Sequence, residues 1–528
     1  MNDKIQTSAV HSYRPSIHIA RLFLTIIFLV SALFTGRAEA MTSLDQQTPA
    51  NPAAAALPAA LLTENLSPSE SEFTQDNETI YLAHLTKRFP TPPSIFGVET
   101  DHLGSTGIQS KASQGNVYFI RRAGFLWSEI EPELTSPRSF NWDAIDNEAL
   151  EQASAQGFSV IAVIRSTPTW AQKYSGVYCG PVKQDNFDEF AGFVQELVAR
   201  YSAPPYNIKY WEIGNEPDVD RSLVLPDSPF GCWGENQYLP NGQPNPAWDG
   251  YYGGRYYAKM LQQVYPAIKA ADPNAKVLNG GLLLSCDFQL PPPDTDCTPS
   301  KFFLGILIEN RAAYLDIVSY HGYTYFYQNK IYEDDYQWGH RGEGGSVMGK
   351  ADFLRDWMGN YGVSKPLLLS ETSMVCPHWS DCTENPGSPE FFDAQADFVV
   401  WAYIRAWANN FAGAIWYTIE GPGWADCGLM ESGYVPRPAY YAYQYMTNKL
   451  SIAQYTGVMN QYASQNVAGY AFSNNGVTIW VLWSKEQVDK VITLPANVIQ
   501  VTDKFGAIIT PVGGQITVNK PVYVELSP

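Results

Sequence analysis

The chain carries little charge for its size, and most of that charge is negative. Charged residues make up 16% of its 528 residues, and 34 Lys+Arg against 53 Asp+Glu give a formal net charge of −19. No basic stripe is present, so nucleic acid and an anionic membrane surface are poor partners for this chain. A neutral, hydroxyl-rich substrate fits this balance better than a polyanion.

Long apolar runs are also missing. The run Leu22 to Phe34 is short for a membrane helix, which needs about 20 residues. Lys4, Arg14 and Arg21 precede it and Ala38-Glu39-Ala40 follows, a pattern typical of a secretory signal cleaved near Ala40. We therefore expect a signal peptide over residues 1–40 and a secreted protein without a membrane segment after cleavage. The alternative is an uncleaved anchor, because the region before the run is long.

Residues 41–90 are rich in Ala, Pro, Ser and Thr, as in Asn51-Pro52-Ala53-Ala54. Such a segment buries too little apolar surface to order itself, so we expect a disordered linker.

From residue 91 to 448, short apolar runs alternate with segments of helical period. Phe190, Phe193, Leu197 and Tyr201 fall on one helical face, and Ser388-Pro389-Glu390 is a typical helix start. Eight strand–helix units predict a parallel (β/α)8 TIM barrel. The expected strands are Ile95–Val98, Val117–Ile120, Phe158–Ile164, Ile208–Ile213, Lys276–Leu284, Leu315–Tyr320, Leu367–Ser370 and Ala414–Ile419.

The last segment, residues 449–528, has no helical periodicity. Its short apolar runs are separated by Asn-Gly, Gly-Gly and Pro, which predicts a small all-β domain of sandwich type. We favour a role in covering the barrel over glycan binding. The expected strands are Val477–Trp483, Val491–Leu494, Val498–Asp503, Ala507–Pro511, Gln515–Val518 and Val522–Leu526.

All seven cysteines follow predicted barrel strands, and their spacings do not match a zinc site. In an exported protein they favour disulfides, although spacing does not fix the connectivity. The pairs we expect are Cys286–Cys297, Cys376–Cys382 and Cys179–Cys232, with Cys427 left unpaired. No cofactor and no metal are expected, and the chain is expected to be a monomer.

Two carboxylates stand at the ends of predicted strands. Glu216 follows the fourth strand in Trp211-Glu212-Ile213-Gly214-Asn215-Glu216-Pro217, and Glu371 ends the seventh in Leu367-Leu368-Leu369-Ser370-Glu371. In a closed barrel both project at the C-terminal mouth, where active sites lie. A pair of facing carboxylates is what cleavage of a glycosidic bond requires.

Other strand ends supply supporting groups. Either Arg121 or Arg122 could hold one carboxylate ionised, and His321 and Tyr323 could donate to a carboxylate or a sugar hydroxyl. Trp170, Trp416 and Trp424 could form stacking walls. For any one of these a core residue is about as good an interpretation.

The motifs around these residues resemble the large clan of retaining glycoside hydrolases built on the barrel (clan A). They are Trp211–Pro217, Glu371, His321-Gly322-Tyr323, Arg122 ahead of Trp127–Pro132, and Thr167–Ala171. Within the clan the nearest likeness is to the family of β-xylosidases and α-iduronidases, family 39, with cellulase-type families next.

The resemblance implies a secreted enzyme that cleaves a β-linked poly- or oligosaccharide with retention. Glu216 would be the acid/base and Glu371 the nucleophile. Asn215 would bind the substrate 2-hydroxyl, Tyr323 and Arg122 would orient Glu371, and His321 and Trp416 would line the subsite of the cleaved sugar. Thr372-Ser373-Met374 replaces an aromatic residue found after the nucleophile in some families, which leaves both the family and the sugar preference open.

Two other interpretations are kept. The chain could be a catalytically silent glycan-binding protein on the same barrel, although both carboxylates are present. Glu333, Asp334 and Asp335 could hold calcium, but such triplets are more often solvated loops.

Overall fold

The computed structural model describes residues 94–222, 224–239, 241–284, 300–327, 330–331, 345–376 and 388–528, which all belong to one compact unit. The expected signal peptide and linker lie outside these residues, as do Cys286, Cys297, Cys382 and the triplet Glu333 to Asp335. Among the described helices, none has the length and apolar character needed to cross a membrane.

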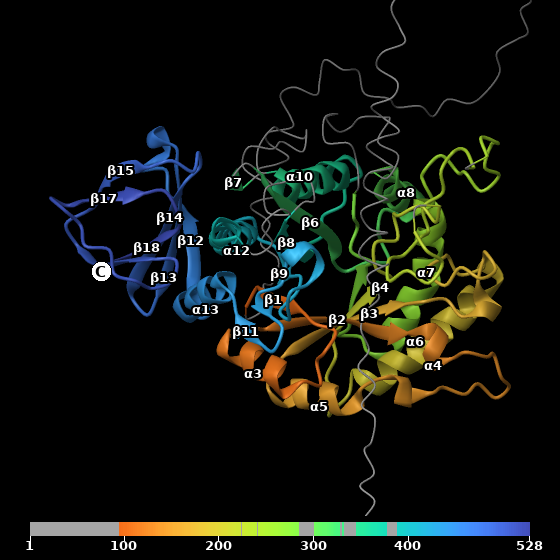
Figure 1. Cartoon of the computed structure of the whole chain (residues 1–528). Coiled ribbons are helices and arrows are strands. Elements are labelled where there is room, and N and C mark those ends of the chain that lie inside the picture. Colours follow the sequence, from red (N-terminus) through yellow and green to blue (C-terminus); the bar gives the residue numbers. More distant parts are fainter. Residues whose placement is uncertain are drawn as a thin grey trace, which may run out of the picture. The chain divides into compact units, whose positions relative to one another are not determined.

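Eight parallel strands form the main sheet, in the order β5-β4-β3-β2-β1-β9-β8-β6 (Figure 1). A short antiparallel strand, β7 (Lys330–Ile331), extends β6. The parallel strands are β1 (Phe96–Glu99), β2 (Phe119–Leu126), β3 (Ser159–Arg165), β4 (Tyr210–Ile213), β5 (Lys276–Asn279), β6 (Val318–Tyr327), β8 (Leu367–Val375) and β9 (Gly413–Trp416).

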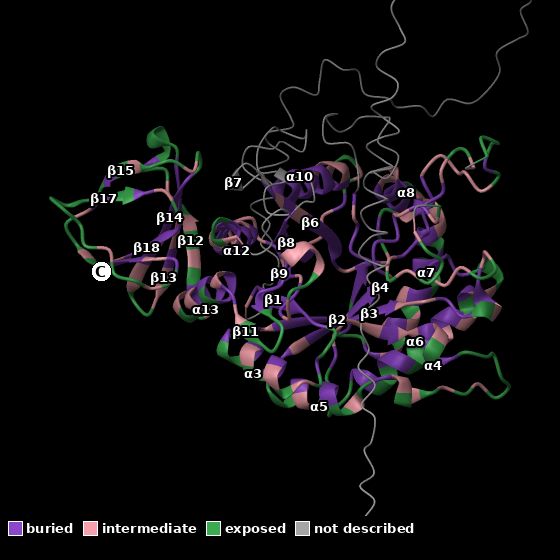
Figure 2. Cartoon of the chain, in the orientation of Figure 1, coloured by how far each residue is buried: buried purple, intermediate pink, exposed green. Residues whose placement is uncertain are grey.

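Parallel bridges from Leu278 to Ile317 and from Leu282 to Tyr320 join β5 to β6 and close the sheet into a barrel. The interior is packed, not hollow. Its apolar layer is contributed by six of the eight strands or their immediate ends: Phe119, Ile161, Leu278, Ile317, Leu368 and Ile415. Figure 2 shows the strands as buried, as expected for a sheet covered on its outer face by helices.

Helices follow the strands in the predicted alternation, which confirms the barrel. On α6 (Phe187–Tyr201) the residues Phe190, Phe193, Leu197 and Tyr201 are buried together, as their spacing predicts. Ser388 caps α12 (Pro389–Ala408) by accepting from the Phe391 N–H. The remaining helices are α3 (Thr106–Gln114), α4 (Trp127–Ile130), α5 (Asn147–Ala155), α7 (Gly254–Ala271), α8 (Ser300–Asn310), α10 (Gly345–Asn360) and α13 (Pro438–Leu450).

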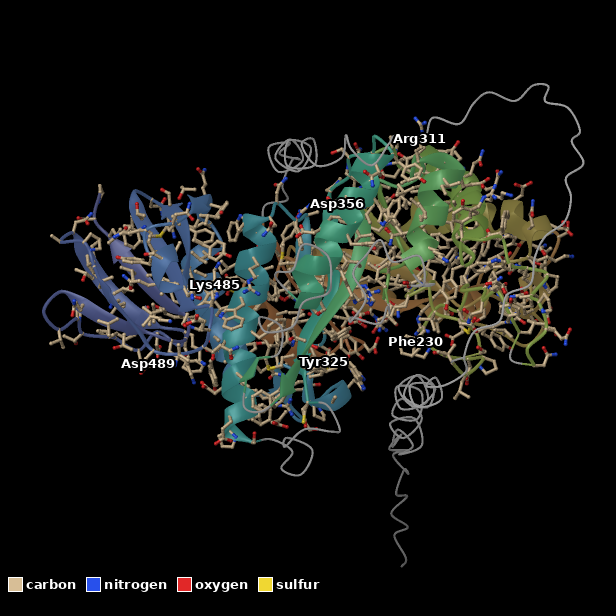
Figure 3. All side chains as sticks on the ribbon, turned by 90° about the horizontal axis from the view of Figure 1, so that it is seen from above. Phe230, Arg311, Tyr325, Asp356, Lys485 and Asp489 are labelled. Atoms are coloured by element: carbon tan, nitrogen blue, oxygen red, sulfur yellow. A yellow bond between two sulfur atoms is a disulfide. The ribbon has the colours of Figure 1, made fainter. Side chains whose placement is uncertain are left out.

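The C-terminal segment forms the expected antiparallel β-sandwich. A five-stranded sheet, β12-β13-β14-β18-β16, packs beside the pair β15-β17 around a separate core. Lys485 and Asp489, labelled in Figure 3, lie in the turn after β14. The strands are β12 (Gln454–Val458), β13 (Val467–Asn474), β14 (Val477–Ser484), β15 (Lys490–Thr493), β16 (Val498–Asp503), β17 (Gln515–Val518) and β18 (Val522–Leu526).

Two details of this domain differ from expectation. The segment Ala507–Pro511 is not a strand and makes only an isolated bridge, from Ile508 to Thr502. Strands β12 and β13 were not expected, because Gly457 and Gly469 interrupt the apolar alternation that marks a strand.

The sandwich packs on α12 through rings and one buried ion pair. Trp401 of α12 stacks on Trp483 of β14 with ring centroids 5.9 Å apart. Lys504 is 4% exposed, and its ammonium donates to Asp397 at 2.5 Å. Lys504 also pairs with Asp393, which Lys520 contacts from the more exposed side.

We expect Lys504→Met to lower the free energy of unfolding by about 3 kcal/mol, because it leaves the Asp397 carboxylate buried without its cation. Chemical denaturation measures the loss. The matched control is Lys520→Met, whose half-exposed pair should be worth less than about 1 kcal/mol. Equal losses in the two variants would show that the buried pair does not hold this contact.

Candidate active site

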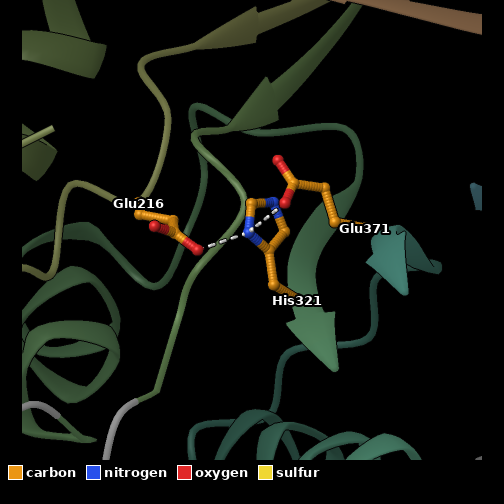
Figure 4. Close-up of side chains that lie close together, drawn as sticks. All are labelled: Glu216, His321 and Glu371. Atoms are coloured by element: carbon orange, nitrogen blue, oxygen red, sulfur yellow. Dashed lines mark hydrogen bonds and ion pairs between the residues drawn. The ribbon is translucent and has the colours of Figure 1, made fainter. Parts of the chain in front are cut away.

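Glu216 and Glu371 come together at the C-terminal mouth of the barrel, and His321 lies between them (Figure 4). The His321 Nδ1 is 2.8 Å from Glu216 Oε1 and 3.4 Å from Glu371 Oε2. One carboxylate oxygen of each glutamate and one imidazole nitrogen of His321 all lie within 4.8 Å of one another. The two acids, far apart in sequence, therefore form a single pair, and all three side chains are buried.

The backbone after β4 turns sharply to aim Glu216 at this point. Gly214 and Glu216 both have positive φ, 90° and 50°, and the Glu216 N–H donates to the carbonyl of Gly280 at 2.6 Å. A positive φ is unusual for a residue with a side chain, and such conformations gather at active sites.

Gly281, two residues after the end of β5, leaves room for His321. A Cβ on Gly281 would come within 2.2 Å of His321 Nε2, and the φ of Gly281 is positive as well. Any side chain here would push the imidazole away from the two carboxylates.

Arg121 binds Glu371 through a charged hydrogen bond inside the barrel. Its guanidinium donates to Glu371 Oε1 at 2.5 Å, to Glu99 Oε2 at 2.6 Å and to Glu212 Oε2 at 2.9 Å. Its other terminal nitrogen donates to Asn215 Oδ1 at 2.7 Å. Arg121 is fully buried, so one cation compensates three buried carboxylates and ties β1, β2, β4 and β8 together.

The arginine expected to orient Glu371 was Arg122, and this expectation is wrong. Along β2, Phe119 belongs to the interior layer, so the alternation of a strand directs Arg121 inward as well and Arg122 away from it. Arg122 instead pairs with Asp101 at 3.1 Å near the surface.

Tyr323 lies where it was expected. Its hydroxyl donates to Glu371 Oε2, and its ring meets Trp424 edge-on with centroids 5.6 Å apart. Tyr323 and Arg121 thus occupy different oxygens of the same carboxylate.

Two tryptophans that we expected to line the site pack against other residues. Trp416 faces the outer core: it packs against Phe398 of α12, and its indole donates to the carbonyl of Cys427 at 2.8 Å. Side chains alternate between the two faces of a strand, and Ile415 faces the interior on β9, so the next residue, Trp416, faces outward. Trp170 packs edge-on against Trp127 and donates to the carbonyl of Glu131.

Burial acts on both acids, but their partners differ. Burial raises the pKa of Glu216 well above its usual range, and the negative charges of Glu371 and Asp218 raise it further. Burial also raises the pKa of Glu371, but the charge of Arg121 and the hydrogen bonds from Tyr323 and Arg121 oppose the rise. The proton is therefore favoured on Glu216 and the negative charge on Glu371. Burial lowers the pKa of His321 well below its usual range, so the imidazole is neutral.

Sequence reasoning missed four supporting residues. Glu99 and Glu212 had a signal, since each is an acid in a short apolar run: Glu99 ends β1, and Glu212 lies within β4. Asp218 accepts from the N–H groups of Leu283 and Leu284 at 2.9 and 2.7 Å, and fixes the chain after β5. Lys350 of α10 is buried and donates to the carbonyl of His321 at 3.0 Å, and only the fold reveals it.

The disulfide Cys179–Cys232 forms as expected and joins the loop after β3 to the loop after β4. Buried Glu235 fastens the same two loops by accepting from Lys173, Tyr174 and Arg221. Cys427 is free and buried, as expected, and Cys376 is disulfide-bonded. The pairings predicted for Cys286, Cys297 and Cys382 stay predictions.

Glu216, His321 and Glu371 are also the one group in the described part of the chain whose atoms could hold a metal ion. The positive charge of Arg121 acts on both carboxylates, and that of Lys350 acts on Glu216. Positive charge beside the group disfavours a divalent cation and suits a pair of acids that exchange protons.

Comparison with known proteins defines the class of fold first. No family model and no curated protein matches the sequence. A family 39 glycoside hydrolase from the gut symbiont Bacteroides cellulosilyticus WH2 superposes with a TM-score of 0.56 and 15% identity, over 83% of this chain and 81% of that one.

Two further structures share the fold. The catalytic domain of GH30 xylanase C from Talaromyces cellulolyticus has a TM-score of 0.51 and 13% identity, over 83% and 99% of the two chains. A conserved exported protein from Bacteroides fragilis has a TM-score of 0.52 and 11% identity, over 82% and 98%. The expected resemblance to barrel-type glycoside hydrolases is confirmed, and at these identities it is a likeness of fold.

The two neighbouring arginines give a matched test of the site. We expect Arg121→Met to destabilise the fold by about 3–5 kcal/mol, because three buried carboxylates lose their shared cation. Arg122→Met removes only a pair with an exposed partner and should cost less than about 1 kcal/mol. Chemical denaturation of both variants measures the difference, and a larger loss for Arg122 would contradict the assignment.

Proposed function

We propose that this protein is a glycoside hydrolase that is exported and cleaves a β-linked poly- or oligosaccharide with retention of configuration. The observation that carries the proposal is the pair of buried carboxylates, Glu216 and Glu371, with oxygens within 4.8 Å of one another. Retaining enzymes place their two carboxyl groups about 5–5.5 Å apart, and inverting enzymes about 6.5–9.5 Å apart. A short separation of the two carboxyl groups supports retention, because an inverting enzyme needs room for a water between its acid and its base.

The two acids have different roles because their surroundings differ. Glu216 keeps its proton and gives it to the glycosidic oxygen as the bond to the anomeric carbon breaks. Glu371, held as an anion by Arg121 and Tyr323, attacks the anomeric carbon and forms a glycosyl ester. Glu216, now ionised, takes a proton from water, which attacks the same carbon and releases Glu371.

His321 and Asn215 support this exchange. A neutral imidazole between the two acids can accept from or donate to Glu216 without adding a charge that would ionise it. The Asn215 amide is fixed by Arg121 beside Glu216, where it can meet a hydroxyl of the substrate. The shared fold with glycoside hydrolases of families 39 and 30 supports the same assignment. The N-terminal sequence pattern supports export.

Glu216→Gln and Glu371→Gln should each lower kcat on a β-linked substrate by several orders of magnitude with the fold retained, because each removes one half of the proton and charge exchange. Azide should restore turnover to Glu371→Gly by occupying the vacated position. Steady-state kinetics with circular dichroism as the folding control makes the test. Full activity in either glutamine variant would end the proposal.

The dependence of activity on pH should reflect the ionisation of the two carboxyl groups. Activity falls at low pH as Glu371 gains a proton, and at high pH as Glu216, whose pKa is raised by burial, loses its own. The charge of Lys350 lowers the pKa of Glu216, so Lys350→Met should move the alkaline limb of kcat/KM to higher pH. Lys259→Met, on the exposed face of α7, is the control and should leave both limbs in place. An alkaline limb that moves to lower pH would contradict the assignment of Glu216 as the acid.

A further inference from the structure

Asp218 is a buried carboxylate, two residues after Glu216, that forms no ion pair within the described part of the chain. It is 2% exposed. Its Oδ1 accepts from the N–H of Leu283 at 2.9 Å, and its Oδ2 accepts from the N–H of Leu284 at 2.7 Å. Each carboxylate oxygen therefore has a donor, but both donors are neutral. The negative charge of such a group is not balanced by a contacting cation, so it acts on neighbouring ionisable groups.

Asp218 is ionised at neutral pH. Burial raises its pKa to about 6, and its backbone hydrogen bonds and the charge of Lys350 oppose the rise. Lys350 donates to the carbonyl of Leu283 at 2.7 Å, so its ammonium is fixed near the same segment of chain. The charge of Asp218 also acts on Tyr252 and Tyr257, which stay neutral because burial raises their pKa values above the usual range.

Charges of both signs act on Glu216. The titratable groups that contact it or act on it are Glu371 of β8, Arg121 of β2, Lys350 of α10, His321 of β6 and Asp218 of the loop after β4. The two anions favour the proton of Glu216, the two cations disfavour it, and the imidazole is neutral. In the proposed mechanism Glu371 loses its charge when it becomes an ester, whereas Asp218 keeps its own.

We propose that Asp218 is a positioning residue for the second half of the reaction, in which its charge makes Glu216 a stronger base toward the attacking water. This inference rests on the proposed function and deepens it. In that step the oxygen of water bonds to the anomeric carbon and its proton passes to Glu216. The ester bond breaks, and its electron pair returns Glu371 to a carboxylate. General base catalysis gains from a stronger base, and a neighbouring anion that persists supplies that strength.

Aryl β-glycosides with two leaving groups separate the two halves of the reaction. Dinitrophenolate leaves without a proton, so kcat/KM reports formation of the ester and kcat reports its hydrolysis. Phenolate is a poorer leaving group and needs the acid, so the alkaline limb of kcat/KM on phenyl glycosides reports Glu216. Both series are prepared with xylose, xylobiose, glucose and cellobiose.

The proteins compared are the wild type, Asp218→Asn, Asp218→Glu and Asp316→Asn. Asp316 is the matched control, because its carboxylate also accepts a backbone N–H, that of Val277 near the start of β5, at 2.8 Å. It does not act on Glu216 among the main influences on that carboxyl group. Circular dichroism checks that each variant is folded.

Asp218→Asn should move the alkaline limb on phenyl glycosides to lower pH by about one unit, because Glu216 loses a neighbouring anion. On dinitrophenyl glycosides it should lower kcat by about 3- to 10-fold and leave kcat/KM within about twofold. Asp218→Glu keeps the charge and should keep the limb, and Asp316→Asn should change neither quantity. If Asp218→Asn does not fold, Asp218→Glu decides, since a limb at lower pH with the charge present would contradict the inference.

The failures of the two proposals can be told apart. An unchanged limb in Asp218→Asn, or equal losses of kcat and kcat/KM on dinitrophenyl glycosides, would show a merely structural role for Asp218. Either result would overturn the inference while leaving the proposed function intact. Absence of cleavage of every aryl and polymeric β-glycoside by the wild type would overturn both.

Discussion

The burial of Arg121 under the mouth of the barrel is the constraint on which the site depends. A guanidinium with no exposed surface needs anionic partners, and Glu99, Glu212 and Glu371 supply them from three different strands. The same contacts fix Glu371 as the anion of the acid pair. Glu216 accepts no hydrogen bond from Arg121 and lies against His321 instead, so the proton is favoured on Glu216 and the negative charge on Glu371, although both are buried.

Most of the barrel could be predicted from sequence because its strands are apolar on both faces and its helices on one. Each of the eight expected barrel strands overlaps an observed one, but the bounds differ: β2 and β6 begin and end later than expected, and β5 ends at Asn279, well before the expected Leu284. The sandwich was predicted less well. Strands β12 and β13 alternate small, polar and aromatic residues around Gly457 and Gly469, and packing against α12, through contacts such as Trp407 on Phe472, stabilises them.

The two acids of the site were predictable because each is an acidic residue that closely follows an apolar run, which is unusual. Which of Arg121 and Arg122 contacts Glu371 could not be predicted. The residues before them, Val117 to Ile120, are apolar throughout, so the sequence shows no alternation that says which arginine faces inward. The same ambiguity misplaced Trp416, next to inward-facing Ile415. Lys350 gave no signal, since a lysine within a helix is ordinary until the fold buries it.

The short separation of the two carboxyl groups predicts retention of configuration at the anomeric carbon, and one measurement tests this prediction directly. Proton NMR of a β-linked substrate during early hydrolysis records which anomer leaves the enzyme before mutarotation. Release of the β-anomer first is the result expected from a nucleophilic Glu371 and a proton-donating Glu216. Release of the α-anomer first would mean that water attacks directly, and would contradict the roles assigned here to both residues.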